Sequence, residues 1–364
     1  MNLMRFPLYR EEVEAVADLP LEWDRLAGRS LLLTGSTGLI GSFLCDVLMD
    51  RNTRRGLGCR VFAQGRSPEK AVMRFLPYLD NPLFTFLPGD VTRFDDRGMR
   101  FDYLVHAAST THPRAYATDP IGTIESNVSG LKHLLEMAAE GCERLMFLSS
   151  VEVYGENRGD TEAFDEGYCG YLDCNTLRAD YSESKRLCEA MCQAYMHQKD
   201  VDVVIPRLAR TFGAGLLRDD SKALSQFLFR GASGEDIILK SAGKQVYSFL
   251  YVPDAVSGIL TCLLRGKRGE AYNVASDACS CMLRDAAQMI ADLSGVSLRY
   301  EQPDAVEASG YSRASRAVMD SRKLAACHWQ PAYSMREALQ RTLAVLRESA
   351  QQADGHDGMN RGVR

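Results

Sequence analysis

The chain has 364 residues, of which 46% are hydrophobic and 25% are charged, and its formal net charge is -5. This is the composition of a globular protein with one large domain or two closely packed ones, and it does not indicate a nucleic-acid surface. No apolar stretch approaches the roughly 20 residues that span a bilayer, so we expect no membrane contact.

The N-terminus lacks the pattern of a secretion signal, and the eleven cysteines then indicate reduced thiols in a cytoplasmic protein. Two close pairs occur, Cys188 with Cys192 and Cys279 with Cys281. Neither is joined by a second pair at the spacing of a zinc site, so we expect no metal.

Short apolar segments alternate with helical segments up to residue 205, after an acidic, partly amphipathic arm at 1–28. The alternation predicts a Rossmann-type α/β domain over 29–205, with a doubly wound parallel sheet. The predicted strands are Ser30–Thr34, Cys59–Gln64, Leu83–Leu87, Tyr103–Ala107, Leu145–Ser149 and Val201–Ile205, and the predicted helices are Ile40–Asp50, Ile124–Glu140 and Tyr181–Met196.

The alternation stops after Pro206, which predicts a smaller mixed α/β substrate lobe over 206–346. The chain is expected to return partly to the large sheet near 247–275. Residues 347–364 are polar and glycine-rich, which predicts a disordered tail. The predicted helices of the lobe are Ser221–Gly231, Asp254–Leu264, Leu283–Leu293 and Met335–Arg347.

A glycine-rich loop connects the first strand to the first helix, with Gly35, Gly38 and Gly41 at the spacing GxxGxxG. Glycines there allow a tight turn and let the backbone approach a pyrophosphate, while the helix N-terminus attracts the anion. The position between an apolar strand and a helix predicts a dinucleotide site. Thr37, Leu39 and Ile40 complete this cofactor loop.

The loop TGSTGLIG resembles the extended branch of the short-chain dehydrogenase/reductase superfamily, the NAD-dependent epimerase/dehydratase family. The resemblance implies that Asp90 and Val91, after the third strand, lie beside the adenine. It also implies that Ala107, Ala108 and Ser109, after the fourth strand, pass the ribose and nicotinamide.

The choice between NAD and NADP depends on the end of the second strand, where an acid would bind the adenosine ribose and repel a 2′-phosphate. This chain has Gly65 there, followed by Arg66 and Ser67. Arg66 and Ser67 could clamp a 2′-phosphate, which slightly favours NADP. Alternatively Arg66 stacks on adenine or faces solvent, and NAD binds.

Tyr181 and Lys185 lie one helical turn apart, so both face the same side of a helix. An ammonium beside a phenol favours the phenolate, which can take a proton from a sugar hydroxyl. Tyr195 and Lys199 repeat the spacing, but Tyr181 opens a helix after a loop and is the better candidate. The resemblance assigns Ser150 as the hydroxyl partner at a strand end.

The segment SSVEVYG places Glu152 where sugar-nucleotide 4,6-dehydratases and UDP-glucuronate decarboxylases carry a glutamate beside the sugar C5. The dehydratases precede it with Asp, but this chain has Val151. Over about residues 29–345 the resemblance is closest to the UDP-glucuronate decarboxylases. The alternative interpretation is that Glu152 is an exposed carboxylate at the end of a strand, without a catalytic role.

Two positions depart from that family. Arg210 stands where relatives carry Asn, and Tyr247 stands where they carry the arginine that grips the diphosphate. A phenol cannot form a bidentate guanidinium clamp, so the diphosphate site is rearranged or the nucleotide differs. The substrate-binding candidates are Thr110, Arg210, Thr211, Lys222, Tyr247, Arg313 and Arg316.

Three functions follow. The first is a redox-neutral nucleotide-sugar enzyme, a decarboxylase, 4-epimerase or dehydratase. The second is an NADPH-dependent keto-sugar reductase, and the third is a dinucleotide-binding regulator without turnover. The predicted helices at Ile124–Glu140 and Tyr181–Met196 occupy the positions through which extended relatives pair, so we expect a homodimer.

Overall fold

The computed structural model describes residues 1–96, 98–111, 113–302 and 314–360. Within these ranges, eight parallel strands form one sheet in the order β11-β7-β5-β4-β1-β2-β3, with β6 paired to β7. The strand order reverses between β1 and β4, where open α/β sheets bind their ligands. The strands are β1 Ser30–Thr34, β2 Arg60–Gly65, β3 Phe84–Pro88, β4 Tyr103–His106, β5 Arg144–Phe147, β6 Ser149–Ser150, β7 Val203–Leu208 and β11 Ala271–Val274.

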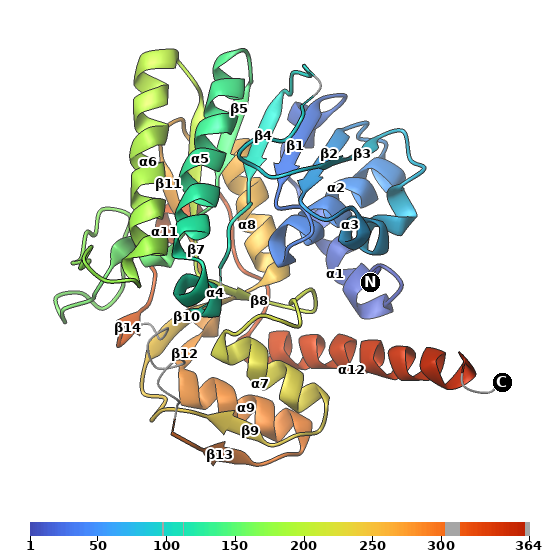
Figure 1. Cartoon of the computed structure of the whole chain (residues 1–364), viewed down its shortest axis with the longest axis vertical. Coiled ribbons are helices and arrows are strands. Elements are labelled where there is room, and N and C mark those ends of the chain that lie inside the picture. Colours follow the sequence, from blue (N-terminus) through green and yellow to red (C-terminus); the bar gives the residue numbers. More distant parts are fainter. Residues whose placement is uncertain (97, 112, 303–313, 361–364) are drawn as a thin grey trace.

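Helices cover both faces of this sheet, which confirms the predicted Rossmann-type fold (Figure 1). The central strand β1 is buried throughout, and its side chains alternate between two apolar clusters. Leu31 and Leu33 join α1, α2 and α8, whereas Leu32 joins α5 and α6. These helices are α1 Pro7–Ala17, α2 Leu39–Arg55, α5 Pro120–Ala139, α6 Ala179–Lys199 and α8 Val252–Arg265.

A smaller lobe packs below the carboxyl edge of the sheet (Figure 1). Its four-stranded sheet has the order β12-β10-β14, with β8 paired to β10, and a separate pair joins β9 to β13. The lobe comprises β8 Arg210–Phe212, β9 Ile237–Leu239, β10 Val246–Tyr251, β12 Ser280–Met282, β13 Leu298–Tyr300, β14 Arg316–Ala317, α7 Ala223–Ala232, α9 Leu283–Ser294, α11 Arg322–Ala325 and α12 Met335–Asn360.

The two ends of the chain are both helical. The N-terminal arm contains α1, whose Tyr9 and Val13 are buried against the main core. The tail predicted to be disordered continues α12 as far as Asn360. Arg347 donates hydrogen bonds to carbonyls at the ends of α7 and α9, and Ser349 is buried. These contacts stabilise the middle of α12, from which the helix extends toward the C-terminus.

A buried charged network joins α1 to the helix after the glycine loop. The Asp46 carboxylate of α2 accepts hydrogen bonds from Tyr9 at 2.7 Å and from Tyr78 at 2.9 Å. It also pairs with Arg74, which belongs to α3 (Pro68–Phe75). Arg74 and Asp46 are both buried, so each depends on the other for neutralisation.

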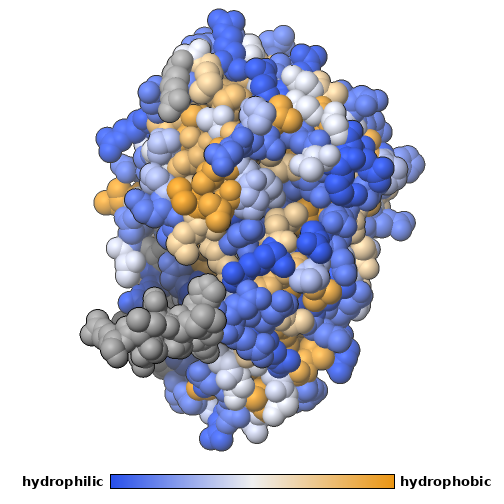
Figure 2. Space-filling model, turned by 90° about the vertical axis from the view of Figure 1, so that its right-hand side faces the viewer, coloured by the Kyte–Doolittle hydropathy of each residue, from blue (hydrophilic) through white to orange (hydrophobic). Residues whose placement is uncertain are grey.

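The surface is mostly hydrophilic but carries apolar side chains on the side where β2, β3 and α3 lie (Figure 2). The exposed apolar residues of α3 and the turn after it are Val72, Met73, Leu76 and Leu79. Among the described residues, no helix combines the length and apolar character needed to cross a membrane.

We predict that Asp46→Ala lowers the free energy of unfolding by about 3–5 kcal/mol, because it leaves the Arg74 guanidinium buried without its counter-ion. Urea denaturation measures this loss. Glu162→Ala is the matched control, since Glu162 pairs with Arg316 on the surface and should change stability little. Equal losses in the two variants would contradict the proposed importance of the buried pair.

Candidate active site

The glycine loop lies against the end of β4. Gly35 has a φ of +66°, and a Cβ at this position would lie 2.7 Å from the Ala107 carbonyl oxygen. A Cβ on Gly41 would lie 2.5 Å from the Gly35 carbonyl oxygen. Glycine is therefore required at both positions for the turn and for the close packing of α2 on the loop.

The N-terminus of α2 is suited to an anion. Gly38 is its N-cap, and in the part of the chain that the structure describes no side chain caps this end and no acid lies in its first turn. Its amide groups are thus available for an anionic ligand. The predicted loop residues Gly35, Thr37, Gly38, Leu39 and Ile40 are half-buried, so this loop fits the pyrophosphate of a dinucleotide.

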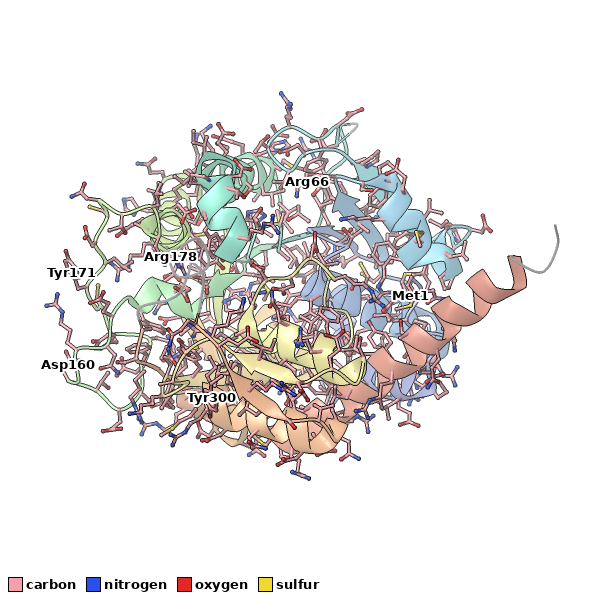
Figure 3. All side chains as sticks on the ribbon, turned by 60° about the horizontal axis from the view of Figure 1, so that its bottom comes forward. Met1, Arg66, Asp160, Tyr171, Arg178 and Tyr300 are labelled. Carbon is pink, nitrogen blue, oxygen red and sulfur yellow. The ribbon has the colours of Figure 1, made fainter. Side chains whose placement is uncertain are left out.

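The predicted adenosine end lies at the ends of β2 and β3. Arg66 is exposed (Figure 3) and lies close enough to Asp90 to help lower the pKa of that carboxyl, after the larger effect of the Thr92 backbone hydrogen bond. Ser67 caps α3: its Oγ accepts from the Lys70 amide at 3.2 Å and donates to Glu69 at 2.7 Å. A 2′-phosphate at Ser67 would therefore meet the Glu69 carboxylate.

The segment after β4 is held by a residue that the sequence analysis missed. Asn127 of α5 is fully buried, and its Oδ1 accepts from Ser109 at 2.8 Å while its Nδ2 donates to Ser184 at 3.0 Å. The amide thus links the predicted nicotinamide-side segment to α6. Val91 lies nearby, with its carbonyl bonded to His133 of α5.

Tyr181, Lys185 and Ser150 come together at the carboxyl edge of the sheet. The Ser150 hydroxyl lies close to the Tyr181 phenol. The Lys185 ammonium donates to the Leu148 carbonyl at 2.9 Å and lies 5.8 Å from the centre of the Tyr181 ring. Tyr195 lies about 20 Å further along α6 and bonds to Glu136, so its position is remote from this group.

Burial perturbs both ionisable groups of this pair. It raises the pKa of Tyr181 to about 12, against the opposing effect of the nearby Ser150 hydroxyl. Burial also lowers the pKa of Lys185 to about 8. The phenol is therefore protonated at neutral pH, and additional positive charge or hydrogen bonding is needed before it can act as a base.

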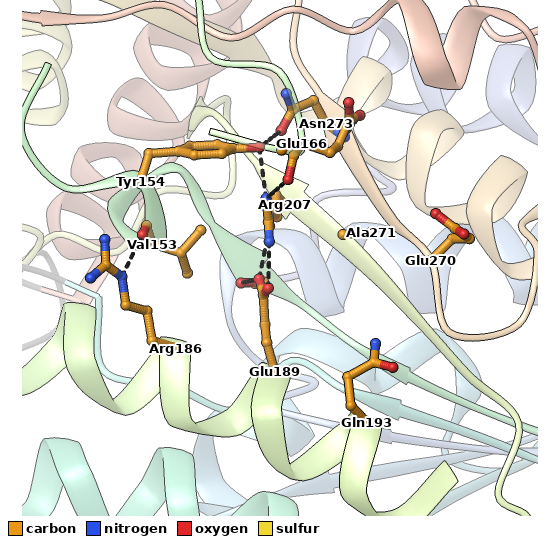
Figure 4. Close-up of polar contacts among 12 residues, drawn as sticks. Val153, Tyr154, Glu166, Arg186, Glu189, Gln193, Arg207, Glu270, Ala271 and Asn273 are labelled. Carbon is orange, nitrogen blue, oxygen red and sulfur yellow. Dashed lines mark hydrogen bonds and ion pairs between the residues drawn. The ribbon is translucent and has the colours of Figure 1, made fainter. Parts of the chain in front are cut away.

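A second charged network holds α6 against β7 (Figure 4). Glu189, one turn after Lys185, receives hydrogen bonds from Arg207 at 3.0 and 2.6 Å and from Ser149 at 2.6 Å. Arg207 also donates to the Tyr154 hydroxyl, which in turn donates to Asn273 of β11 at 2.5 Å. Ser149 thus has a structural partner, and Ser150 is left to face Tyr181.

Glu152 lies between two arginines rather than in open solvent. Its Oε2 accepts from Arg178 and its Oε1 from Arg210, each at 3.1 Å. Burial raises the pKa of Glu152, but attraction to the two guanidinium groups outweighs this effect and holds the pKa below its usual value. The preceding residue, Val151, is buried and has an apolar side chain, so this position supplies no acid.

The predicted substrate residues take different positions. Arg210 stacks on the ring of Tyr247, 3.8 Å from its centre, and the Tyr247 hydroxyl bonds to the Ala314 carbonyl. The two positions that depart from the family pattern, Arg210 and Tyr247, are therefore in direct contact with each other. Thr110 is half-buried near Ser109, Thr211 bonds to the Ala209 carbonyl, and Lys222 pairs with Asp220.

Arg316 is not brought to the group around Glu152. Arg316 pairs in register with Val246, so its side chain leaves the small sheet on the face opposite Tyr247, where it bonds to Glu162. Arg313 lies outside the described residues.

Two aromatic and cationic residues near Tyr181 were also missed. Tyr116 of α4 (Pro113–Thr118) is buried and stacks on Tyr181, with ring centres 5.0 Å apart. Arg178 (Figure 3) also lies over the Tyr116 ring, with its guanidinium carbon 4.8 Å from the ring centre. Arg178 precedes Tyr181 by three residues, and this spacing before the YxxxK motif is the only sequence feature that could have indicated it.

The comparisons place this geometry among known proteins. The family described as NAD dependent epimerase/dehydratase matches residues 31–275. UDP-glucuronic acid decarboxylase 1 of Danio rerio is 28% identical over 328 residues, which is 90% of this chain and 75% of the relative. UDP-glucuronic acid decarboxylase 6 of Arabidopsis thaliana is 26% identical over 309 residues, 85% of this chain and 86% of the relative.

The fold has close structural neighbours. The UDP-glucuronic acid 4-epimerase of Bacillus cereus, solved with UDP-glucuronic acid and NAD, has a TM-score of 0.76 at 20% sequence identity. The match covers 88% of this chain and 99% of that one. The comparisons therefore confirm the resemblance that the glycine loop and the YxxxK motif indicated.

We predict that Gly35→Ala weakens NAD binding at least about tenfold, because the added Cβ pushes against the backbone of Ala107 and Ala108. Fluorescence titration with NAD measures this. Gly56→Ala is the matched control, since Gly56 has nearly the same φ, +65°, but no atom within 4 Å of the added Cβ. Unchanged NAD binding in Gly35→Ala would place the cofactor elsewhere.

Proposed function

Because the chain belongs to the NAD dependent epimerase/dehydratase family, we propose that it is an enzyme that uses bound NAD(P) to oxidise a hydroxyl of a nucleotide sugar transiently. The observation that carries this proposal is the meeting of Tyr181, Ser150 and Lys185 beside the segment that follows β4. A regulator without turnover would have no need for this acid–base group.

The residues of the chain handle the proton of the reacting hydroxyl. Bound oxidised nicotinamide supplies the hydride acceptor and a positive charge that favours the phenolate. Tyr181 takes the hydroxyl proton and returns it when the ketone is reduced. Ser150 orients the hydroxyl, and Lys185, held by the Leu148 carbonyl, keeps a cationic group beside the phenol.

Decarboxylation of a nucleotide uronate is the first choice of reaction. Oxidation at C4 makes the C6 carboxylate part of a β-keto acid, whose C5–C6 bond breaks to release carbon dioxide. The electron pair passes to the C4 oxygen through an enolate, C5 takes up a proton, and reduction at C4 completes a redox-neutral turnover. Similarity to the UDP-glucuronic acid decarboxylases supports this order.

Epimerisation at C4 comes second and dehydration third. A 4,6-dehydratase must protonate the departing C6 hydroxyl, and the buried Val151 offers no proton at the position where that acid is expected. Glu152 is the nearby carboxylate for proton exchange at C5. Its two arginine partners keep it ionised, which suits a base better than an acid.

A keto-sugar reductase that uses NADPH is the alternative, favoured by Arg66. We propose that Arg66 favours NADP, because Gly65 presents no acid to the adenosine ribose and Arg66 is exposed at that point. Glu69, bonded to Ser67, opposes this preference by repelling a 2′-phosphate. The preference for NADP is therefore small.

We also propose a homodimer in the cytoplasm. Helices α5 and α6 lie side by side (Figure 1) and expose Ile121, Ile124 and Leu187. Pairing of this face with a second copy would bury these side chains. All eleven cysteines are free thiols, which supports a reducing compartment.

The proposed reaction is tested by incubating the protein with UDP-glucuronate or dTDP-glucose, each with NAD and with NADP, and identifying products by mass spectrometry. We expect carbon dioxide and a UDP-pentose from UDP-glucuronate. Tyr181→Phe should lower the rate on the order of 10²-fold or more without unfolding, whereas Tyr195→Phe should leave it unchanged. Rapid formation of a 4-keto-6-deoxy sugar would overturn the ranking.

For the cofactor, we predict that NADP binds more tightly than NAD and that Arg66→Ala removes the difference. Glu69→Gln should increase NADP affinity without changing NAD affinity, because it removes a negative charge next to the 2′-phosphate. Titration of both dinucleotides measures these effects. Tighter NAD binding by the wild-type protein would reject the role of Arg66.

For assembly, light scattering at micromolar concentration should give the mass of a dimer. Leu187→Glu should convert it to a monomer, because a charge on the paired α6 face would be buried. Met73→Glu on α3 is the matched control and should leave the dimer intact. A monomer mass for the wild-type protein would contradict this proposal.

A further inference from the structure

Three charged side chains form a cluster, which we call the Glu152 cluster: Glu152, Arg178 and Arg210. Each arginine gives the carboxylate one hydrogen bond of 3.1 Å. These three side chains carry two positive charges and one negative charge. Asp180 also lies near Arg178, but burial raises the pKa of its carboxyl, which favours the neutral form.

The arginines also have donors to spare. Nε and Nη1 of Arg178 and Nη1 of Arg210 are buried and have no hydrogen-bond partner among the described residues. Buried guanidinium donors without acceptors are unfavourable, and a carboxylate can accept from two of them at once. These donors therefore favour the addition of a planar anion.

Aromatic rings restrict both guanidinium groups. Arg178 lies over Tyr116 and Arg210 over Tyr247, with the guanidinium carbon 4.8 and 3.8 Å from the ring centres. A guanidinium that stacks on an aromatic ring lies parallel to it, so the N–H groups at the edge of the guanidinium remain available for hydrogen bonds. The two arginines are therefore held in place before any ligand arrives.

The cluster lies at the reacting end of the site. The backbone amide of Glu152 donates to the Ser150 hydroxyl at 3.2 Å, and this hydroxyl lies close to the Tyr181 phenol. Tyr116, beneath Arg178, stacks directly on Tyr181. An anion at this cluster is thus next to the hydroxyl whose proton Tyr181 takes. This favours an acidic group on the reacting sugar over the diphosphate that follows it.

We propose that Arg178 and Arg210 form a binding site for a carboxylate on the reacting sugar, and that Glu152 is the counter-ion which this carboxylate partly replaces. The inference rests on the proposed function, because it assumes a nucleotide sugar at Tyr181. Arg210 then determines the preference for an acidic sugar over the neutral one. Release of Glu152 from one arginine leaves it free to exchange a proton with the substrate.

The test measures binding of UDP-glucuronate and UDP-glucose by calorimetry to the NAD-loaded protein. All variants carry Tyr181→Phe so that neither ligand is consumed. Arg210→Gln should weaken UDP-glucuronate binding at least about tenfold and leave UDP-glucose within about threefold. Arg210→Lys, which keeps the charge, should lie between the wild-type residue and Gln. Arg299→Gln, a surface arginine of β13, is the charge-matched control and should change neither affinity.

Glu152→Gln gives a result of opposite sign. It removes the competing carboxylate, so UDP-glucuronate should bind several-fold more tightly while UDP-glucose is unaffected. Equal weakening of both ligands by Arg210→Gln would assign Arg210 to the diphosphate and overturn the inference. Looser UDP-glucuronate binding in Glu152→Gln, or binding of neither ligand, would also overturn it. Because no turnover is needed, these results are separate from the product assay.

Discussion

The position of α6, which lies on one face of the sheet with its N-terminal turn at the carboxyl ends of the strands, is the constraint on which the site depends. Lys185 reaches the Leu148 carbonyl at the end of β5, and Glu189 forms a two-point ion pair with Arg207 of β7. Both interactions are mostly buried, so water competes little with them. Tyr181, one turn before Lys185, therefore lies at the sheet edge, close to the Ser150 hydroxyl.

The cofactor loop meets the same edge from the other side. Gly35 lets β1 end against the backbone of Ala107 and Ala108, and the segment after them is tied to α6 through Asn127. The loop and α6 are thus linked through one buried amide. This link holds the proposed dinucleotide site on α2 and the proposed proton-transfer group on α6 at the same edge of the sheet.

Charge at the substrate end distinguishes this chain from the family pattern. Tyr247 occupies the position of the expected diphosphate arginine, but Arg210 from the neighbouring strand β8 lies on its ring. The positive charge is therefore kept but moved toward Glu152. Relatives carry Asn and Arg at these two positions. Compared with them, we expect an enzyme with this arrangement to bind the sugar of its substrate more strongly and to contact the diphosphate through different residues.

The sequence by itself determined the Rossmann-type fold and identified the residues that we propose as the core of the site. Apolar strands such as Ser30–Thr34, the glycine loop, and the YxxxK motif of Tyr181 act over a few residues, so local spacing reveals them. Only the tertiary structure decided the partners of Glu152. Arg210 is 58 residues away from it, and an ion pair across such a separation depends on how β8 packs beside the catalytic edge. Local patterns also missed the extension of α12, because packing against α7 and α9 outweighs its polar composition.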